Sequence, residues 1–207
     1  MSEVKNPGII MKVLDWAYEK AINGAGLVES ASMLAGDYQK MNSDREKAID
    51  SLIQWQTTKC ATAGFITGIG GMLTLPIAIP ANISSVLFMQ LRMVAAIAIM
   101  RGYNPKSDQV QSLAYICLTG SAATDLLKSV GIRVGRQITE SAIQKISSNT
   151  IAQINEKVGF RLLSKFGSEG LINLSKAVPL IGGVVSGAVD AASTKVIGKT
   201  AKHTFAY

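Results

Sequence analysis

The chain of 207 residues lacks charge over its longest apolar stretch, because no Asp, Glu, Lys or Arg occurs between Lys59 and Arg92. Charged residues make up only 17% of the sequence, whereas typical globular proteins contain roughly 25%. Aromatic residues are also scarce, at 6%. The apolar mass therefore consists of small aliphatic residues and glycine, which is typical of closely packed helices or of contact with lipid. A hydrophobic fraction of 48% argues against a disordered chain.

Cysteine and histidine are almost absent, since Cys60, Cys117 and His203 are the only ones. These three residues cannot supply the four protein ligands of a structural zinc site. We expect Cys60 and Cys117 to be free, buried thiols in a reducing cytoplasm, with a disulfide between them as the alternative. The N-terminus has no basic segment followed by an apolar one, so we expect no secretory signal and a cytoplasmic location.

The sequence also lacks a catalytic constellation. Gly198-Lys199-Thr200 resembles the end of a phosphate-binding loop, but Ser193 stands where the first glycine of that loop belongs. No serine has the Gly-x-Ser-x-Gly context of a hydrolase nucleophile, and the acidic residues form no pair arranged for acid–base chemistry. We therefore predict a protein that is not an enzyme and that uses no metal and no cofactor.

Glycine and proline interrupt the uncharged segment from Cys60 to Leu91. The interrupting residues are Gly64, Gly68, Gly70, Gly71, Pro76 and Pro80. Proline removes a backbone donor and clashes with the preceding helical turn, which disfavours one straight membrane span although about 20 apolar residues are enough for one. We predict a helix to about residue 72, a turn over 74–80 and a helix over 81–100. The result is an apolar helical hairpin at about 60–100 that is either the core of the fold or lies in lipid.

Helical spacing of apolar residues recurs along the rest of the chain. The expected helices cover about 9–22, 28–41, 46–59, 108–129 and 136–156, and a basic helix follows near the C-terminus. Ser43 and Glu46 have the spacing of a capping box. No segment shows the sustained alternation of a strand, and no linker marks a domain boundary. The sequence thus predicts an all-α fold in which residues 1–207 form a single-domain helical bundle around the Gly/Pro-broken apolar hairpin at about 60–100.

A second uncharged run covers 177–189 and contains Pro179, Gly182 and Gly183. It is too short to span a bilayer. The glycines at 159, 167 and 170 predict a loose or short-helical stretch before it.

Arg92 is the first charged residue after the uncharged segment, and charges in apolar surroundings usually have a partner. Asp125 and Asp190 lie within or beside apolar stretches, where a helix cap or an ion pair is a more common role for a carboxylate than catalysis. We predict that Arg92 pairs with a carboxylate, with Asp125 and Asp190 as the candidates.

The net charge of +7 is concentrated after residue 60. A basic surface of this kind is typical of proteins that bind nucleic acid or an anionic membrane. Nucleic acid is disfavoured because the basic residues are isolated and no aromatic residues are interleaved with them. Lysines and arginines that merely solvate helix faces are the plain alternative.

Several short motifs resemble those of the EcsC family of bacterial proteins. They are Gly64–Gly71, Leu75–Ala81, Gln90–Arg92, Gly102-Tyr103, Val178–Gly183, Asp190 and Thr194. The resemblance implies a helical, membrane-associated protein, but it brings no established reaction, cofactor or catalytic residue. The positions singled out as structural or functional candidates are Gly64, Gly68, Gly70, Gly71, Pro76, Pro80, Arg92, Asp125, Pro179, Gly182, Gly183 and Asp190.

The leading hypothesis for function is a non-enzymatic helical protein at the cytoplasmic face of the bacterial inner membrane, with anionic lipid or a membrane-bound protein as its partner. The alternative is a soluble interaction protein, such as an adaptor, a chaperone or an immunity factor, whose apolar hairpin is simply the core. A membrane-inserting, toxin-like protein is a third possibility, because uncharged helical hairpins recur in such proteins.

Overall fold

The computed structural model describes residues 7–61, 81–132, 140–166 and 182–206. These residues form helices, and no β-strand occurs among them beyond an isolated bridge between Ala25 and Val28. The helices are α1 (Pro7–Asn23), α2 (Ala31–Met41), α3 (Arg45–Ala61), α5 (Ala81–Met100), α6 (Asp108–Cys117), η2 (Gly120–Ala122), α7 (Ala123–Ser129), α8 (Glu140–Gln144), α9 (Ser148–Phe166) and α11 (Gly182–Thr204). The predicted all-α fold is confirmed.

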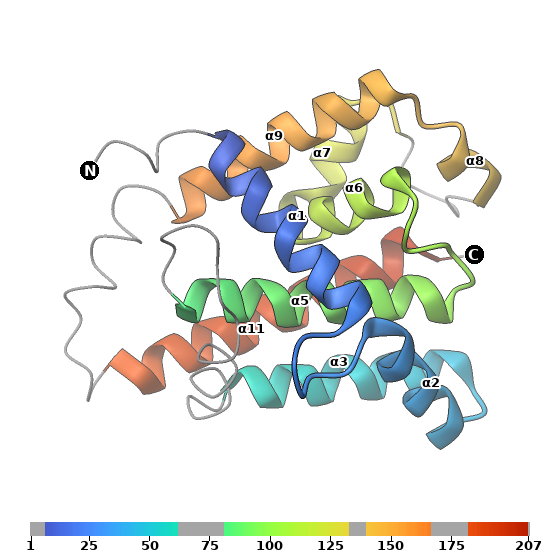
Figure 1. Cartoon of the computed structure of the whole chain (residues 1–207), viewed down its shortest axis with the longest axis vertical. Helices are drawn as coiled ribbons and strands as arrows, with labels where there is room; N and C mark the ends of the chain where they lie inside the picture. The colour runs from blue at the N-terminus through green and yellow to red at the C-terminus, as the bar shows by residue number, and fades with distance from the viewer. Residues whose placement is uncertain (1–6, 62–80, 133–139, 167–181, 207) are drawn as a thin grey trace.

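Helix α5 is the centre of the fold. Helices α1, α2, α3, α6 and α11 all pack against it (Figure 1). From Ser85 to Ala98 every side chain of α5 is buried. The predicted helix over 81–100 is therefore correct, and its described part is the core of the bundle. The first arm of the predicted hairpin and its turn lie outside the described residues.

Helix α1 covers one face of α5 with the stripe that the sequence predicts. Its inward residues are Ile10, Val13, Leu14, Ala17 and Ala21, all buried. They join one continuous apolar cluster with side chains from α2 to α11.

Short polar side chains begin several of the helices. Ser30, Ser107 and Ser147 each accept a hydrogen bond from the backbone N–H three residues later, which satisfies one of the donors left open in the first turn. The cap of α3 differs from the prediction by one residue. Asp44, and not Ser43, accepts bonds from the backbone N–H groups of Glu46 (2.8 Å) and Lys47 (3.2 Å).

Two predicted helices are interrupted in the structure. The helix expected over 108–129 stops at Cys117 and resumes at Ala123, because Gly120 adopts a left-handed φ of +61° between them. The helix expected over 136–156 is divided into α8 and α9 at residues 145–147. Helix α9 then continues through Gly159 to Phe166, where a loose or short-helical stretch was expected. Buried Val158 and Leu162 hold this part of α9 in place.

Helix α11 packs mainly on α3 and also on α5. The crossing with α3 is close at Gly198, where a Cβ atom would come within 2.8 Å of Ile53 Cγ1. Over the described ranges, none of the helices combines the length and apolar character needed to cross a membrane.

Candidate functional site

Acidic, histidine and cysteine side chains do not converge on a chemical centre in the described parts of the chain. No group of three or more of them there could hold a metal ion. Cys60 and Cys117 are free and buried, as predicted. Burial raises the pKa of the Cys117 thiol to about 12, so this thiol is protonated and unreactive at neutral pH.

Most of the candidate positions from the sequence lie outside the described residues. These are Gly64, Gly68, Gly70, Gly71, Pro76, Pro80 and Pro179. Gly182 and Gly183 begin α11. Asp125 is exposed on α7 and lines a shallow depression of about 260 Å³ with Ser129 and Arg161.

Arg92 is buried, with an exposed fraction of 3%. Its Nη1 donates a 3.0 Å hydrogen bond to the backbone carbonyl of Glu29, and its guanidinium lies 5.8 Å from the ring centre of Phe88. Its Nε has no hydrogen-bond partner. Burial lowers the pKa of Arg92, and the negative charge of Glu29 together with Tyr38 opposes this. Among the described residues, the carboxylate that acts on Arg92 is therefore that of Glu29, and none of them forms an ion pair with Arg92 within 4.0 Å.

Asp125 and Asp190 were predicted as the partners of Arg92, and this prediction is wrong. Arg92 faces the segment before α2, whereas Gln90, two residues earlier, bonds to α11. Two residues along a helix correspond to a rotation of roughly 200°, so these neighbours point to opposite sides of α5. Asp190 lies on the α11 side, where it acts on Cys60 and not on Arg92.

A buried polar seam joins α3, α5 and α11. Gln90 Nε2 donates to the hydroxyls of Ser193 and Thr194, both at 3.1 Å. Burial raises the pKa of the Cys60 thiol, a hydrogen bond with Thr194 lowers it, and the charge of Asp190 raises it. Gln56 is fully buried, and neither its amide oxygen nor its amide nitrogen has a partner.

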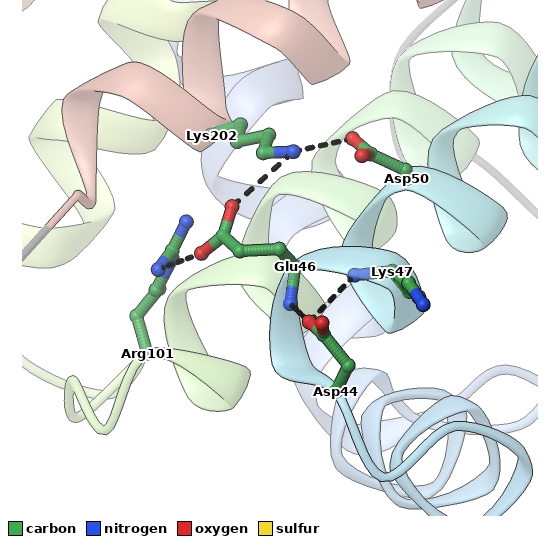
Figure 2. A network of polar contacts seen from close by, with 6 residues as sticks. All are labelled: Asp44, Glu46, Lys47, Asp50, Arg101 and Lys202. Carbon is green, nitrogen blue, oxygen red and sulfur yellow. Dashed lines mark hydrogen bonds and ion pairs between the residues drawn. The ribbon is translucent and has the colours of Figure 1, made fainter.

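An ion network closes the far end of the same helix junction (Figure 2). Glu46, at the start of α3, pairs with Arg101 just after α5 and with Lys202 near the end of α11, the latter at 3.2 Å. Lys202 also contacts Asp50 at 2.5 Å. Arg101 is nearly buried, while Glu46 is half exposed. The network therefore links three helices that are distant in sequence.

The network lowers the pKa of Glu46 and raises the pKa of Lys202. Burial of Glu46 raises its pKa, but hydrogen bonds and charges from Arg101 and Lys202 outweigh this, so the pKa lies below its usual value. Burial lowers the pKa of Lys202, but Asp50 and Glu46 outweigh this and raise it. Both groups are therefore charged at neutral pH.

A groove of about 670 Å³ lies between α2 and α3, and we call it the α2–α3 groove. Its lining residues are Glu29, Leu34, Asp37, Tyr38, Met41, Ser51, Gln54, Trp55, Thr58 and Lys59. Met41 and Trp55 are exposed by 74% and 52%, which is unusual for large apolar side chains. The Lys59 ammonium lies 5.5 Å from the ring centre of Trp55.

A second groove, the α9–α11 groove, has a volume of about 660 Å³. Its lining residues are Thr119, Gly120, Ser121, Arg161, Leu162, Ser164, Val189, Ala192, Ser193, Val196 and Ile197. Val189 and Val196 are exposed by 62% and 43%, and Phe160, next to Arg161, by 54%. The same helices expose Lys195 and Lys199. The groove lining thus combines exposed apolar side chains with the cation Arg161.

The α9–α11 groove and the α2–α3 groove share no lining residue. Helix α9 is at the top of Figure 1 and helices α2 and α3 are at the bottom, while α11 packs on α3. Neither groove was predicted from the sequence. Each is built from two segments distant in the chain, and periodicity within one helix does not reveal its neighbour. The sequence signal that could have indicated the α2–α3 groove is the pair of Trp55 and Lys59, which are four residues apart and so share a helix face.

Gln90 and Thr194, which both belong to the motifs resembling the EcsC family, are hydrogen-bonded to each other in the structure. The sequence model of the EcsC protein family matches residues 12–207. No curated protein and no solved structure shows a significant match to the chain.

Proposed function

Because the chain belongs to the EcsC protein family, we propose that it acts without catalysing a reaction, by docking on the anionic cytoplasmic surface of the bacterial inner membrane. The observation that carries this proposal is the α9–α11 groove. Val189 and Val196 are exposed there, beside Arg161 in the groove wall. Apolar side chains that enter the headgroup region and cations that meet anionic lipid are the two components of surface binding.

The charge of this region supports an anionic partner. Lys157, Arg161, Lys195 and Lys199 belong to α9 and α11, and each cation near an anionic bilayer contributes about 1 kcal/mol. Lys157 donates to the hydroxyl and the carbonyl of Ser129 at 2.8 and 3.1 Å, so it is held near the surface of α7. The attraction falls off within a Debye length and weakens as salt is added.

Sedimentation with vesicles tests the proposal. The protein is expected to sediment with phosphatidylglycerol-containing vesicles at low salt and less at high salt, and not with neutral phosphatidylcholine vesicles. Arg161→Glu changes the charge by two units and should weaken partitioning by about 2 kcal/mol, roughly 30-fold. Lys106→Glu, an equal change in the exposed turn before α6, should have little effect. Absence of sedimentation at both salt concentrations would contradict the proposal.

The burial of α5 supports a second candidate function, that of a soluble interaction protein. The described part of this apolar helix is covered by neighbouring helices, so its composition alone does not require lipid. Fractionation of tagged protein with and without a carbonate wash distinguishes membrane docking from the soluble alternative. Membrane docking predicts a membrane fraction that carbonate releases, whereas the soluble alternative predicts protein in the supernatant before any wash.

A further inference from the structure

We propose that the depression between α7 and α9 binds the headgroup of a phosphatidylglycerol-type lipid, with Lys157 and Arg161 holding the phosphodiester and Asp125 accepting from hydroxyls beyond it. This inference rests on the proposed membrane docking, because the bilayer supplies the headgroup. We call this hollow, of about 260 Å³, the α7–α9 depression. Its lining residues are Ala122, Asp125, Leu126, Ser129, Lys157 and Arg161.

The α7–α9 depression adjoins the α9–α11 groove. Arg161 lines both of them. Residues 119–121 line the groove, and the next residue of the chain, Ala122, lines the depression. The groove lining includes exposed Val189 and Val196, whereas the lining of the depression includes three charged side chains. An apolar surface next to a polar hollow matches the two parts of a lipid, its chains and its headgroup.

Two cations of the depression are available to a ligand. Lys157 and Arg161 are four residues apart on α9 and so share a helix face. Lys157 Nζ donates to the hydroxyl and the carbonyl of Ser129, which holds its ammonium at the depression and leaves one of its three donors for a ligand. Both acceptors on Ser129 are neutral. Arg161 has no hydrogen bond or ion pair with the described residues, and a guanidinium can donate to two phosphate oxygens at once.

The lining of the depression has an excess of one positive charge, because these two cations stand against the one carboxylate of Asp125. Lys128 and Glu156, nearby charged residues of α7 and α9, do not line the depression and have opposite charges. A phosphodiester carries one negative charge and matches this excess, whereas a phosphate monoester carries about −1.5 to −2 at neutral pH. Water screens these charges in the free protein, and a bilayer that covers the depression removes part of that screening.

Asp125 gives the depression a preference among anionic headgroups. Its carboxylate forms no ion pair within 4.0 Å with any described residue, although both cations line the same depression. An ionised carboxylate only accepts hydrogen bonds, so the ligand has to supply a donor. The hydroxyls of phosphatidylglycerol are such donors on a headgroup with a single negative charge. The ammonium of phosphatidylethanolamine is also a donor, but that headgroup has no net charge to match the excess.

The test compares two lipids of equal charge, each mixed into phosphatidylcholine vesicles at low salt. Phosphatidylglycerol has hydroxyls beyond its phosphodiester, and phosphatidylmethanol has a methyl group there. The protein should bind phosphatidylglycerol vesicles about tenfold more tightly, which is the effect of one hydrogen bond to a charged group. Asp125→Ala should bring the ratio of the two affinities close to one. Asp37→Ala, which removes an equal charge from the exposed pair on α2, should leave the ratio unchanged.

Equal binding of the two lipids by the unmodified protein would overturn the headgroup site and leave membrane docking in place. The same holds if Asp125→Ala keeps the ratio, or if Asp37→Ala changes it as much. Absence of binding to both lipids would contradict membrane docking itself, and the headgroup site with it. Soluble glycerophosphoglycerol is the last probe, and it should bind far more weakly than the vesicles. If it binds as tightly, the depression recognises a free phosphodiester and the assignment to a lipid is wrong.

Discussion

Gly198 and Gly36 illustrate how differently two helical glycines are used. Gly198 lies at the crossing of α11 and α3, where an added Cβ would meet Ile53 Cγ1 at 2.8 Å, Ile53 Cγ2 at 2.9 Å and Met93 Cε at 3.2 Å. Ile53 and Met93 are both buried, so Ile53 cannot turn both branches away. Gly36 lies in α2 with nothing within 4 Å of the same hypothetical atom.

We expect Gly198→Ala to lower the free energy of unfolding by about 1–2 kcal/mol. Overpacking costs about 1–3 kcal/mol, and the higher helix propensity of alanine offsets up to about 1 kcal/mol of this. Gly36→Ala should raise it by up to about 1 kcal/mol through helix propensity alone. Urea denaturation of the two variants measures whether the free energy of unfolding falls for Gly198→Ala and rises for Gly36→Ala. Stabilisation by Gly198→Ala would show that α11 does not cross α3 as closely as described.

At the same scale, the predicted ion pair of Arg92 with a carboxylate is wrong. Arg92 is buried, and its guanidinium donates to the backbone carbonyl of Glu29. The partner depends on which neighbour lies roughly 200° around α5 from Gln90, and a single sequence does not contain that information. The cap of α3 was misplaced for a related reason, since Ser43 and Asp44 both suit an N-cap and Glu46 is held by Arg101 and Lys202 instead.

At the scale of elements, α5 was predicted with its correct bounds because strong signals flank it. Pro80 precedes the helix, and Gly102, with a φ of +87°, follows it. The break at Gly120 was missed because a glycine in a left-handed turn and a glycine within a helix look alike in sequence. The opposite error was made at Gly159, where the sequence predicted that a helix had ended but α9 continues. Packing of Val158 and Leu162 outweighs the low helix propensity of glycine there.

The attachment of α11 to α3 and α5 should depend on pH through Glu46. Its pKa lies below the usual 4.5 in the folded protein, so its contribution to stability is present above pH 4.5 and is lost as the pH falls through the folded value. Glu46→Gln should cost about 1–2 kcal/mol at pH 7, because Arg101 is left buried without its partner while half of Glu46 is already in water.

Unfolding in urea at pH 7 and at about pH 3.5 measures this effect. The difference in the free energy of unfolding between the unmodified protein and its Glu46→Gln variant should be smaller at the lower pH. Asp37→Asn is the control, because the exposed pair of Asp37 and Lys40 contributes little. A gap that is the same at both pH values would show that Glu46 does not stabilise the junction as a carboxylate.

On the scale of the whole molecule, the described residues form a buried apolar centre, with the α2–α3 groove and the α9–α11 groove at the surface. The centre was predicted from composition and periodicity, since a long uncharged helix must be buried or lie in lipid. The grooves were not predicted, because Met41 with Trp55 and Arg161 with Val196 become neighbours only through tertiary packing. We propose that the membrane docks on the α9–α11 groove and not on the apolar core helix α5.

A tryptophan placed in the α9–α11 groove tests this central claim most directly. The variant carries Val189→Trp, at an exposed position of the groove lining, in a chain whose own tryptophans, Trp16 and Trp55, are replaced by Phe. With phosphatidylglycerol vesicles containing brominated lipid, we expect quenching of the new tryptophan and none for a tryptophan at position 106. Protein that sediments with the vesicles while the tryptophan at position 189 remains unquenched would contradict docking through this groove.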